Sequence, residues 1–213
     1  MTAKDKNGKY AEEAIWLYVA EIPELPVFSP IVCKQREAEV CGTADELHRA
    51  EKYYAWRLLE RAAGELFGFD TDVIEFNKEP CRRWVCDAFY FSISHSEGAV
   101  AVIISRDTPV GVDIQAKKPI SQRLAKRIMT DTEQAEYSLL SKCEKQEYAL
   151  RAWCAKEALY KLGYTDAFSA STSKFDRAAT LSYYEHASGG KDFLICAAFG
   201  RNFQAPNIRL VSF

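Results

Sequence analysis

The spacing of hydrophobic residues predicts one strand and one long helix in the first third of the chain. Between residues 45 and 67, hydrophobic side chains recur every three to four positions, and Gly68 can close the helix in a left-handed cap. Residues 14–22 (AIWLYVAEI) are rich in aromatic and β-branched side chains and end before Pro23 and Pro26. This composition, with these boundaries, predicts a strand.

The most strand-like part of the chain lies in its middle. Residues 88–94 (AFYFSIS), 99–105 (AVAVIIS) and 110–115 (VGVDIQ) are separated by short turns. Short loops between such runs favour an antiparallel meander. Residues 72–76 (DVIEF) predict one more strand upstream, and a charged loop separates it from the meander.

Two helices are predicted after this block by their capping signals. Thr130 precedes Glu133, and Ser141 precedes Glu144, at the spacing of a capping box. In such a box the two side chains satisfy backbone amides at the start of the helix. The second box opens a long helix, which Gly163 is placed to end.

The last part of the chain returns to strands. Residues 180–185 and 192–199, joined through a Gly-Gly turn, predict a hairpin, and residues 208–213 predict a final strand. Helices and strands come in blocks rather than as βαβ units, so we expect an α+β fold with mostly antiparallel strands. We expect two α+β halves, residues 1–108 and 109–213, with one long helix packed in each.

Composition and charge narrow the setting of the protein. The 213 residues are 48% hydrophobic, enough to bury a full core, and the net charge of −2 lacks the basic excess of a nucleic-acid-binding protein. The seven cysteines are an odd number without metal-binding spacing, which indicates reduced thiols and no structural zinc. The apolar run near the start is too short to span a membrane. We expect a cytoplasmic monomer without membrane or nucleic-acid partners.

Candidate chemistry begins with residues 153–161 (WCAKEALYK). Trp153, Glu157 and Lys161 are four residues apart, so they project from one face of the predicted helix. The ordinary explanation is an exposed Glu–Lys pair, which stabilises a helix by only about 0.2–0.5 kcal/mol. A functional explanation requires a second acidic group opposite this face.

The strand at residues 110–115 supplies such a group. Val110, Val112 and Ile114 share one face of the strand, which leaves Asp113 on the other. Aspartate is depleted inside strands, so Asp113 either faces solvent at an edge or serves a site. The small residue at position 111 leaves room for a helix to approach this face closely.

Oxygen ligands for a metal can then converge. If the helix of Glu157 crosses this strand, Glu157 meets Asp113, and Gln115 offers an amide oxygen on the same face. Two carboxylates, an amide and waters form the hard-oxygen set that Mg²⁺ prefers. In the preceding turn, Ser94 and His95 offer hydrogen-bond donors that suit a phosphate.

Three motifs, FSISHS, VGVDIQ and WCAKEALYK, occur in this order. Together they resemble the Sfp-type (surfactin-type) 4′-phosphopantetheinyl transferases, whose signature is a (V/I)G(V/I)D(I/V)E strand followed downstream by (F/W)xxKE(A/S)xxK. The segments HRAEKYYAWRLLER and NKEP resemble the family's basic first helix and a stretched form of its Gly-Lys-Pro loop. The resemblance implies two pseudo-symmetric α+β halves with coenzyme A in the cleft between them.

The resemblance also implies a reaction. The phosphopantetheine arm of coenzyme A moves to a serine hydroxyl of an acyl or peptidyl carrier protein, and adenosine 3′,5′-bisphosphate is released. By this resemblance Asp113 and Glu157 are Mg²⁺ ligands. Gln115 stands where the family has a third acid, and it would contribute directly or through water. Glu157, directly or through a metal-bound water, would also take the proton of the serine, and Lys161 would stabilise or protonate the departing bisphosphate.

Contacts to the coenzyme follow from the same resemblance. Lys52 and Lys78 match the positions of basic residues that hold the coenzyme phosphates. Ser94 and His95 match a hairpin that grips them. Lys156, on a different face of its helix from Glu157, is expected along the cofactor.

A basic segment suggests the kind of partner, and two alternative functions stay open. A basic run beyond the metal strand suits an acidic carrier protein; it comprises Lys117, Lys118, Arg123, Lys126 and Arg127. A non-catalytic module that binds coenzyme A or a carrier is one alternative, in which Gln115 would reflect loss of the metal site. A metal-dependent nuclease is another. The joint presence of Asp113, Glu157 and Lys161 speaks against the first, and the slightly negative net charge against the second.

Overall fold

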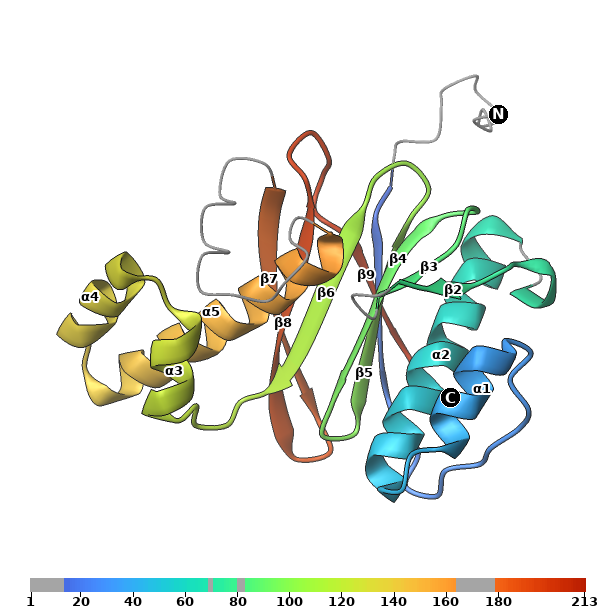
Figure 1. Cartoon of the computed structure of the whole chain (residues 1–213), viewed down its shortest axis with the longest axis horizontal. Coiled ribbons are helices and arrows are strands. Elements are labelled where there is room, and N and C mark those ends of the chain that lie inside the picture. Colours follow the sequence, from blue (N-terminus) through green and yellow to red (C-terminus); the bar gives the residue numbers. More distant parts are fainter. Residues whose placement is uncertain (1–13, 69–70, 80–82, 164–178) are drawn as a thin grey trace.

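The computed structural model describes residues 14–68, 71–79, 83–163 and 179–213. These residues form two larger sheets between two long helices, and a small two-stranded sheet of β2 and β3 (Figure 1). The expected α+β class is confirmed, and the strand pairs of the described residues are antiparallel apart from β1 with β9. In chain order the elements are β1 (Trp16–Glu21), α1 (Lys34–Cys41), α2 (Glu46–Phe67), the 3₁₀ turn η1 (Thr71–Val73), β2 (Asn77–Lys78), β3 (Trp84–Val85), β4 (Tyr90–Ser96), β5 (Ala99–Ser105), β6 (Val110–Ala116), α3 (Gln122–Ile128), α4 (Asp131–Leu139), α5 (Lys142–Leu162), β7 (Ala179–Ser188), β8 (Lys191–Gly200) and β9 (Asn207–Val211).

Helix α2 covers the outer face of the first sheet, whose strand order is β4-β5-β1-β9 (Figure 1). Tyr18 and Ala20 of β1 face α2 in one buried cluster. Leu17 and Val19 of the same strand belong to a second cluster, which lies between the two sheets. The side chains thus alternate between two cores, as the two-residue period of a strand requires.

The second sheet has the order β6-β8-β7, and α5 packs on its outer face (Figure 1). Val112 and Ile114 of β6 point into the core between the sheets. On the other side, Ala158 and Leu162 of α5 are buried against residues of β8. The molecule is therefore layered as α2, first sheet, second sheet and α5.

The predicted ends of both long helices are confirmed. Asp45 caps α2 by accepting a hydrogen bond from a backbone amide of the first turn, and Ser141 with Glu144 forms a capping box at α5. Gly68 and Gly163 follow the two helices with φ of 66° and 97°, values that favour glycine. These local signals fix where the helix carrying the candidate acid and lysine begins and ends.

Gly111 allows α5 to lie directly on β6. A Cβ atom at this position would lie 2.0 Å from the carbonyl oxygen of Ala158 and 2.7 Å from the backbone nitrogen of Leu162. Both of these atoms belong to helix backbone, so no side chain could rotate away to make room. The expected close approach of the helix to this strand is confirmed.

Gly111→Ala is expected to lower the free energy of unfolding by about 1–3 kcal/mol or more, because the helix must shift away from the strand. Urea unfolding followed by circular dichroism measures the change. Gly42→Ala is the matched control, since its Cβ would meet one carbonyl oxygen at 3.1 Å in a right-handed helical conformation. Equal stability loss in the two variants would contradict the close contact at Gly111.

The expected three-stranded meander is wrong at its third strand. β4 and β5 pair as predicted, but β6 belongs to the second sheet. Serine side chains of β4 stand between the two backbones, and their hydroxyls accept the amide hydrogen bonds that a neighbouring strand would otherwise accept. The contacts are Val112 N to Ser92 Oγ at 3.2 Å, Ile114 N to Ser94 Oγ at 3.2 Å and Ala116 N to Ser96 Oγ at 3.1 Å.

Other elements also differ from expectation. The strand predicted at residues 72–76 is replaced by η1 and extended chain. The short helices α1 and α3 were not predicted, because their polar segments carry little hydrophobic periodicity. β9 forms as predicted but pairs in parallel with β1, so it joins the first sheet. Strands β1, β4 and β5 of the first sheet thus precede residue 109, whereas β9 of the same sheet follows it. No helix within the described ranges is long and apolar enough to cross a bilayer.

Candidate active site

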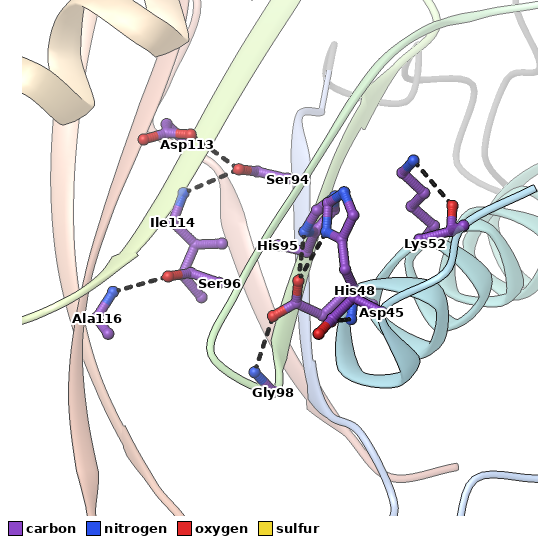
Figure 2. A network of polar contacts seen from close by, with 12 residues as sticks. Asp45, His48, Lys52, Ser94, His95, Ser96, Gly98, Asp113, Ile114 and Ala116 are labelled. Carbon is purple, nitrogen blue, oxygen red and sulfur yellow. Dashed lines mark hydrogen bonds and ion pairs between the residues drawn. The ribbon is translucent and has the colours of Figure 1, made fainter. Parts of the chain in front are cut away.

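The candidate site lies where β6, β4 and α5 meet. Asp113 is on the face of β6 toward α5, and its residue is only 2% exposed. Its Oδ1 atom accepts hydrogen bonds from Ser94 Oγ and from Lys161 Nζ, both at 2.8 Å (the first is drawn in Figure 2). Its Oδ2 atom accepts one from Gln115 Nε2, also at 2.8 Å. Asp113 is thus buried, and both of its carboxylate oxygens accept hydrogen bonds. The alternative, in which Asp113 faces solvent at the edge of a sheet, is excluded.

Ser94 ties the two sheets together at this point. Its hydroxyl donates to Asp113 and accepts from the backbone amide of Ile114 (Figure 2). Lys161 Nζ lies 2.9 Å from the same hydroxyl oxygen. The side chain from the first sheet therefore orients both the carboxylate on β6 and the ammonium on α5.

Glu157 lies one helical turn before Lys161 and is partly buried. Burial raises the pKa of Glu157, because a charged carboxylate loses hydration there. The positive charge of Lys161 acts against this rise, and the negative charge of Asp113 adds to it. The predicted convergence of Asp113, Glu157 and Lys161 is therefore present, and the pair on α5 is not an ordinary exposed one.

The donor set suits a hard divalent cation. The negative charge of Asp113 on β6 acts on Glu157 of α5, and burial together with this repulsion disfavours two charges there. A divalent cation relieves such repulsion, and carboxylate oxygens are the ligands that Mg²⁺ takes in proteins. Asp113 and Glu157 are the residues that would hold it. Gln115 turns its amide nitrogen toward Asp113, so in this structure it is a hydrogen-bond donor to the first carboxylate.

The predicted coenzyme contacts do not all lie together. Ser94 and His95 are consecutive in β4, so they point to opposite sides, Ser94 toward β6 and His95 toward α2 (Figure 2). Lys52 of α2 contacts Thr43, with Nζ 3.1 Å from Oγ1. The side chains of His95 and Lys52 therefore lie in the N-terminal layer, on the other side of β4 from Asp113.

Two more predicted lysines have protein partners. Lys78 of β2 pairs with Glu39, with Nζ 2.5 Å from Oε1, and its ammonium lies 5.3 Å from the ring centre of Trp84. Lys156 is 3% exposed and donates to the carbonyl of Ile128 and to Glu133. The side chain of Lys156 therefore points toward α3 and α4, and its expected place along the cofactor stays a prediction.

A pocket of about 310 Å³ borders Lys161 between the two halves of the fold. Arg83 and Trp84 line it from the N-terminal side, and Gly163 lines it at the end of α5. A guanidinium, an ammonium and an indole ring on one pocket suit a phosphorylated ligand with an aromatic base. Arg83 and Trp84 escaped sequence analysis, although the charged loop that contains them was noticed.

Comparison with known proteins finds a family match over the part of the chain that carries this site. Residues 109–201 match the model of the 4′-phosphopantetheinyl transferase superfamily, and this segment carries Asp113, Glu157 and Lys161. The match begins at the second sheet and runs through β8. It lies on the same part of the chain as two of the three motifs.

Two curated relatives make the resemblance more specific. The chain is 37% identical over 108 residues to 4′-phosphopantetheinyl transferase Sfp of Bacillus subtilis (strain 168), an alignment that covers 49% of this chain and 47% of the relative. It is 33% identical over 138 residues to 4′-phosphopantetheinyl transferase psf-1 of Bacillus pumilus, covering 61% and 58%. The chain thus aligns with about half the length of the curated relatives it matches. These matches confirm the predicted resemblance to Sfp-type 4′-phosphopantetheinyl transferases.

Proposed function

We propose that this protein transfers the 4′-phosphopantetheine group of coenzyme A to a serine hydroxyl of an acyl or peptidyl carrier protein and releases adenosine 3′,5′-bisphosphate. The observation that carries the proposal is the convergence of Asp113, Glu157 and Lys161 within the matched segment. Phosphoryl-group transfer needs charge stabilisation, a base for the attacking alcohol and a cation for the leaving phosphate. These three side chains supply groups of each kind.

Each residue has a distinct role in this reaction. Glu157 takes the proton of the carrier serine, and its raised pKa makes it a stronger base than an exposed carboxylate. Lys161, held by Asp113 and Ser94, directs positive charge toward the departing bisphosphate. Mg²⁺, when bound by Asp113 and Glu157, supplies further positive charge for the pyrophosphate. Ser94 holds the side chains of Asp113 and Lys161 in position through hydrogen bonds to both.

The coenzyme is proposed to lie along the N-terminal half. Arg83 and Lys161 on the pocket suit its phosphates, with Trp84 available for stacking. Lys52, Lys78 and the outer side of the hairpin at His95 are retained as further candidates for phosphate contacts. We also propose a cytoplasmic location, which the free thiols of the described cysteines support.

Product analysis separates this function from its rivals. The protein is incubated with apo carrier protein, coenzyme A and Mg²⁺, and the nucleotides are resolved by liquid chromatography. Release of adenosine 3′,5′-bisphosphate that requires the carrier is expected. A binding module would leave coenzyme A intact. A nuclease would instead cleave added DNA or RNA without needing the carrier.

The carrier is proposed to dock beside α3 through its acidic surface. Lys117 and Lys118 have partners in Glu185 and Glu97, with Nζ to carboxylate distances of 2.7 and 2.9 Å. The remaining basic residues of the run lie on α3 and are exposed; they are Arg123, Lys126 and Arg127. Exposed cations of this kind steer an acidic partner and act mainly on association.

Reversal of charge at Arg123 and Arg127, both to Glu, is expected to raise the KM for an acidic carrier about tenfold at low salt, with kcat little changed. Steady-state kinetics at two salt concentrations measures the effect, which should shrink as salt rises. Lys34→Glu on α1 is the control, because Lys34 is equally exposed but lies in the other half. An unchanged KM in the double variant would move the docking surface elsewhere.

A further inference from the structure

A second cluster of ligand-type side chains lies between α2 and β4, and it includes His95, one of the predicted coenzyme contacts. His48 and Glu51 are three residues apart on α2, and His95 reaches them from β4 (Figure 2). Both Nδ1 atoms approach the same carboxylate oxygen, Glu51 Oε2, at 3.4 Å from His48 and 3.0 Å from His95. One ligand atom from each residue lies within 4.8 Å of the others. The centres of the two imidazole rings are 5.1 Å apart.

These separations match the edges of a tetrahedral metal site. Zinc binds histidine nitrogen and carboxylate oxygen at about 2.0–2.1 Å, so two ligands of a tetrahedron lie about 3.3 Å apart. The two separations from Glu51 Oε2, 3.0 and 3.4 Å, bracket that value. Side-chain rotation would bring the three ligand atoms, which already lie within 4.8 Å of one another, to bonding distance of one ion.

A backbone hydrogen bond orients the carboxylate of Glu51. Its second oxygen, Oε1, accepts a hydrogen bond of 3.1 Å from the backbone amide of Gly98, which fixes the plane of the carboxylate (Figure 2).

The cluster is also open on one side. The exposed fraction of the side chain is 8% for Glu51, 23% for His95 and 47% for His48. An ion can enter from the His48 side, and solvent or an added ligand can complete its coordination there. Two histidines and one carboxylate with an open position form a ligand set of the kind that zinc takes in proteins.

We propose that His48, Glu51 and His95 form a binding site for a transition-metal ion of the Zn²⁺ type. The site is chemically distinct from the pair of carboxylates at Asp113 and Glu157. Imidazole nitrogen favours zinc and similar ions, whereas an all-oxygen set favours Mg²⁺. The test of this site requires neither coenzyme nor carrier protein, so its outcome is independent of the proposed transferase activity.

Metal titration of the purified chain tests this site. Metal-free protein, with accessible thiols alkylated so that exposed Cys41 and Cys143 do not compete, is titrated with Zn²⁺ against a chromophoric chelator. One tightly held zinc ion per chain is expected. His48→Ala should weaken binding about tenfold or more, because it removes a ligand. His48 is the most exposed member of the cluster, so this variant should fold normally.

Two further arms make the test decisive. His186→Ala is the matched control, since it removes the remaining histidine of the chain, and it should bind zinc like the wild type. Excess Mg²⁺ should fail to displace the zinc. Equal zinc affinity in His48→Ala and wild type, or displacement by Mg²⁺, would overturn the proposal and leave the cluster as a hydrogen-bonded His–Glu–His contact between α2 and β4.

Discussion

Glu157→Gln is expected to reduce the kcat of phosphopantetheine transfer about 100-fold or more while leaving the fold intact. Glutamine has the shape of glutamate but cannot accept a proton as a base, and loss of a general base typically has this effect. Stability should not fall, because burial and the nearby Asp113 already raise the pKa of Glu157 and so disfavour its charge. Single-turnover transfer rates and urea unfolding measure the two effects separately.

A matched control lies on the same helix. Glu147 and Arg151 form an exposed pair at the same four-residue spacing, with Oε1 3.0 Å from Nε. Glu147→Gln should change neither turnover nor stability appreciably, since exposed pairs of this kind contribute only tenths of a kcal/mol. If Glu157→Gln behaved like Glu147→Gln, the carboxylate at position 157 would be ordinary helix surface and the assigned base would be wrong.

Asp113→Ala is expected to abolish measurable transfer and to raise sharply the Mg²⁺ concentration needed for any residual activity. Asp113 would be one of only two charged metal ligands, and it also anchors Lys161 and Ser94. Its removal leaves Lys161 beside a buried hydroxyl without its counter-charge, so a loss of stability is expected as well. Initial rates across a Mg²⁺ titration, with unfolding curves for the same protein, give both quantities.

Gln115 provides the comparison for this prediction. Gln115→Ala should change the Mg²⁺ requirement little, because the side chain donates to Asp113 through its nitrogen. Gln115→Glu should lower the Mg²⁺ concentration for half-maximal rate, since it adds a negative charge beside the proposed ligands. Should Gln115→Ala prove as damaging as Asp113→Ala, the amide itself would be a required ligand or coenzyme contact.

Local signals explain why the sequence predicted the helices that build the site. Asp45, Ser141 and Gly163 act within one turn of their own helix, so their effects can be read without knowing the fold. The four-residue spacing of Glu157 and Lys161 likewise placed them on one face. Gly111 showed where the helix could cross, because a missing side chain is visible in the sequence.

Contacts between distant segments explain what the sequence did not predict. β6 does not pair with the neighbouring strand of the expected meander, because hydroxyls such as that of Ser94 accept its amide hydrogen bonds. The hydrophobic pattern of a strand does not indicate which acceptor its backbone amides will contact. β9 pairs with β1, although the two strands lie near opposite ends of the described residues. The histidine cluster has the same origin, since His48 and Glu51 are local to α2 but His95 arrives from another strand.

Intact mass spectrometry of an apo carrier protein tests the central proposal most directly. The carrier is incubated with this protein, coenzyme A and Mg²⁺, with EDTA and with Glu157→Gln as parallel reactions. The proposed chemistry predicts a gain of one phosphopantetheine mass on the carrier, lost with EDTA and strongly slowed by Glu157→Gln. An unchanged carrier mass across a panel of acyl and peptidyl carriers would contradict it.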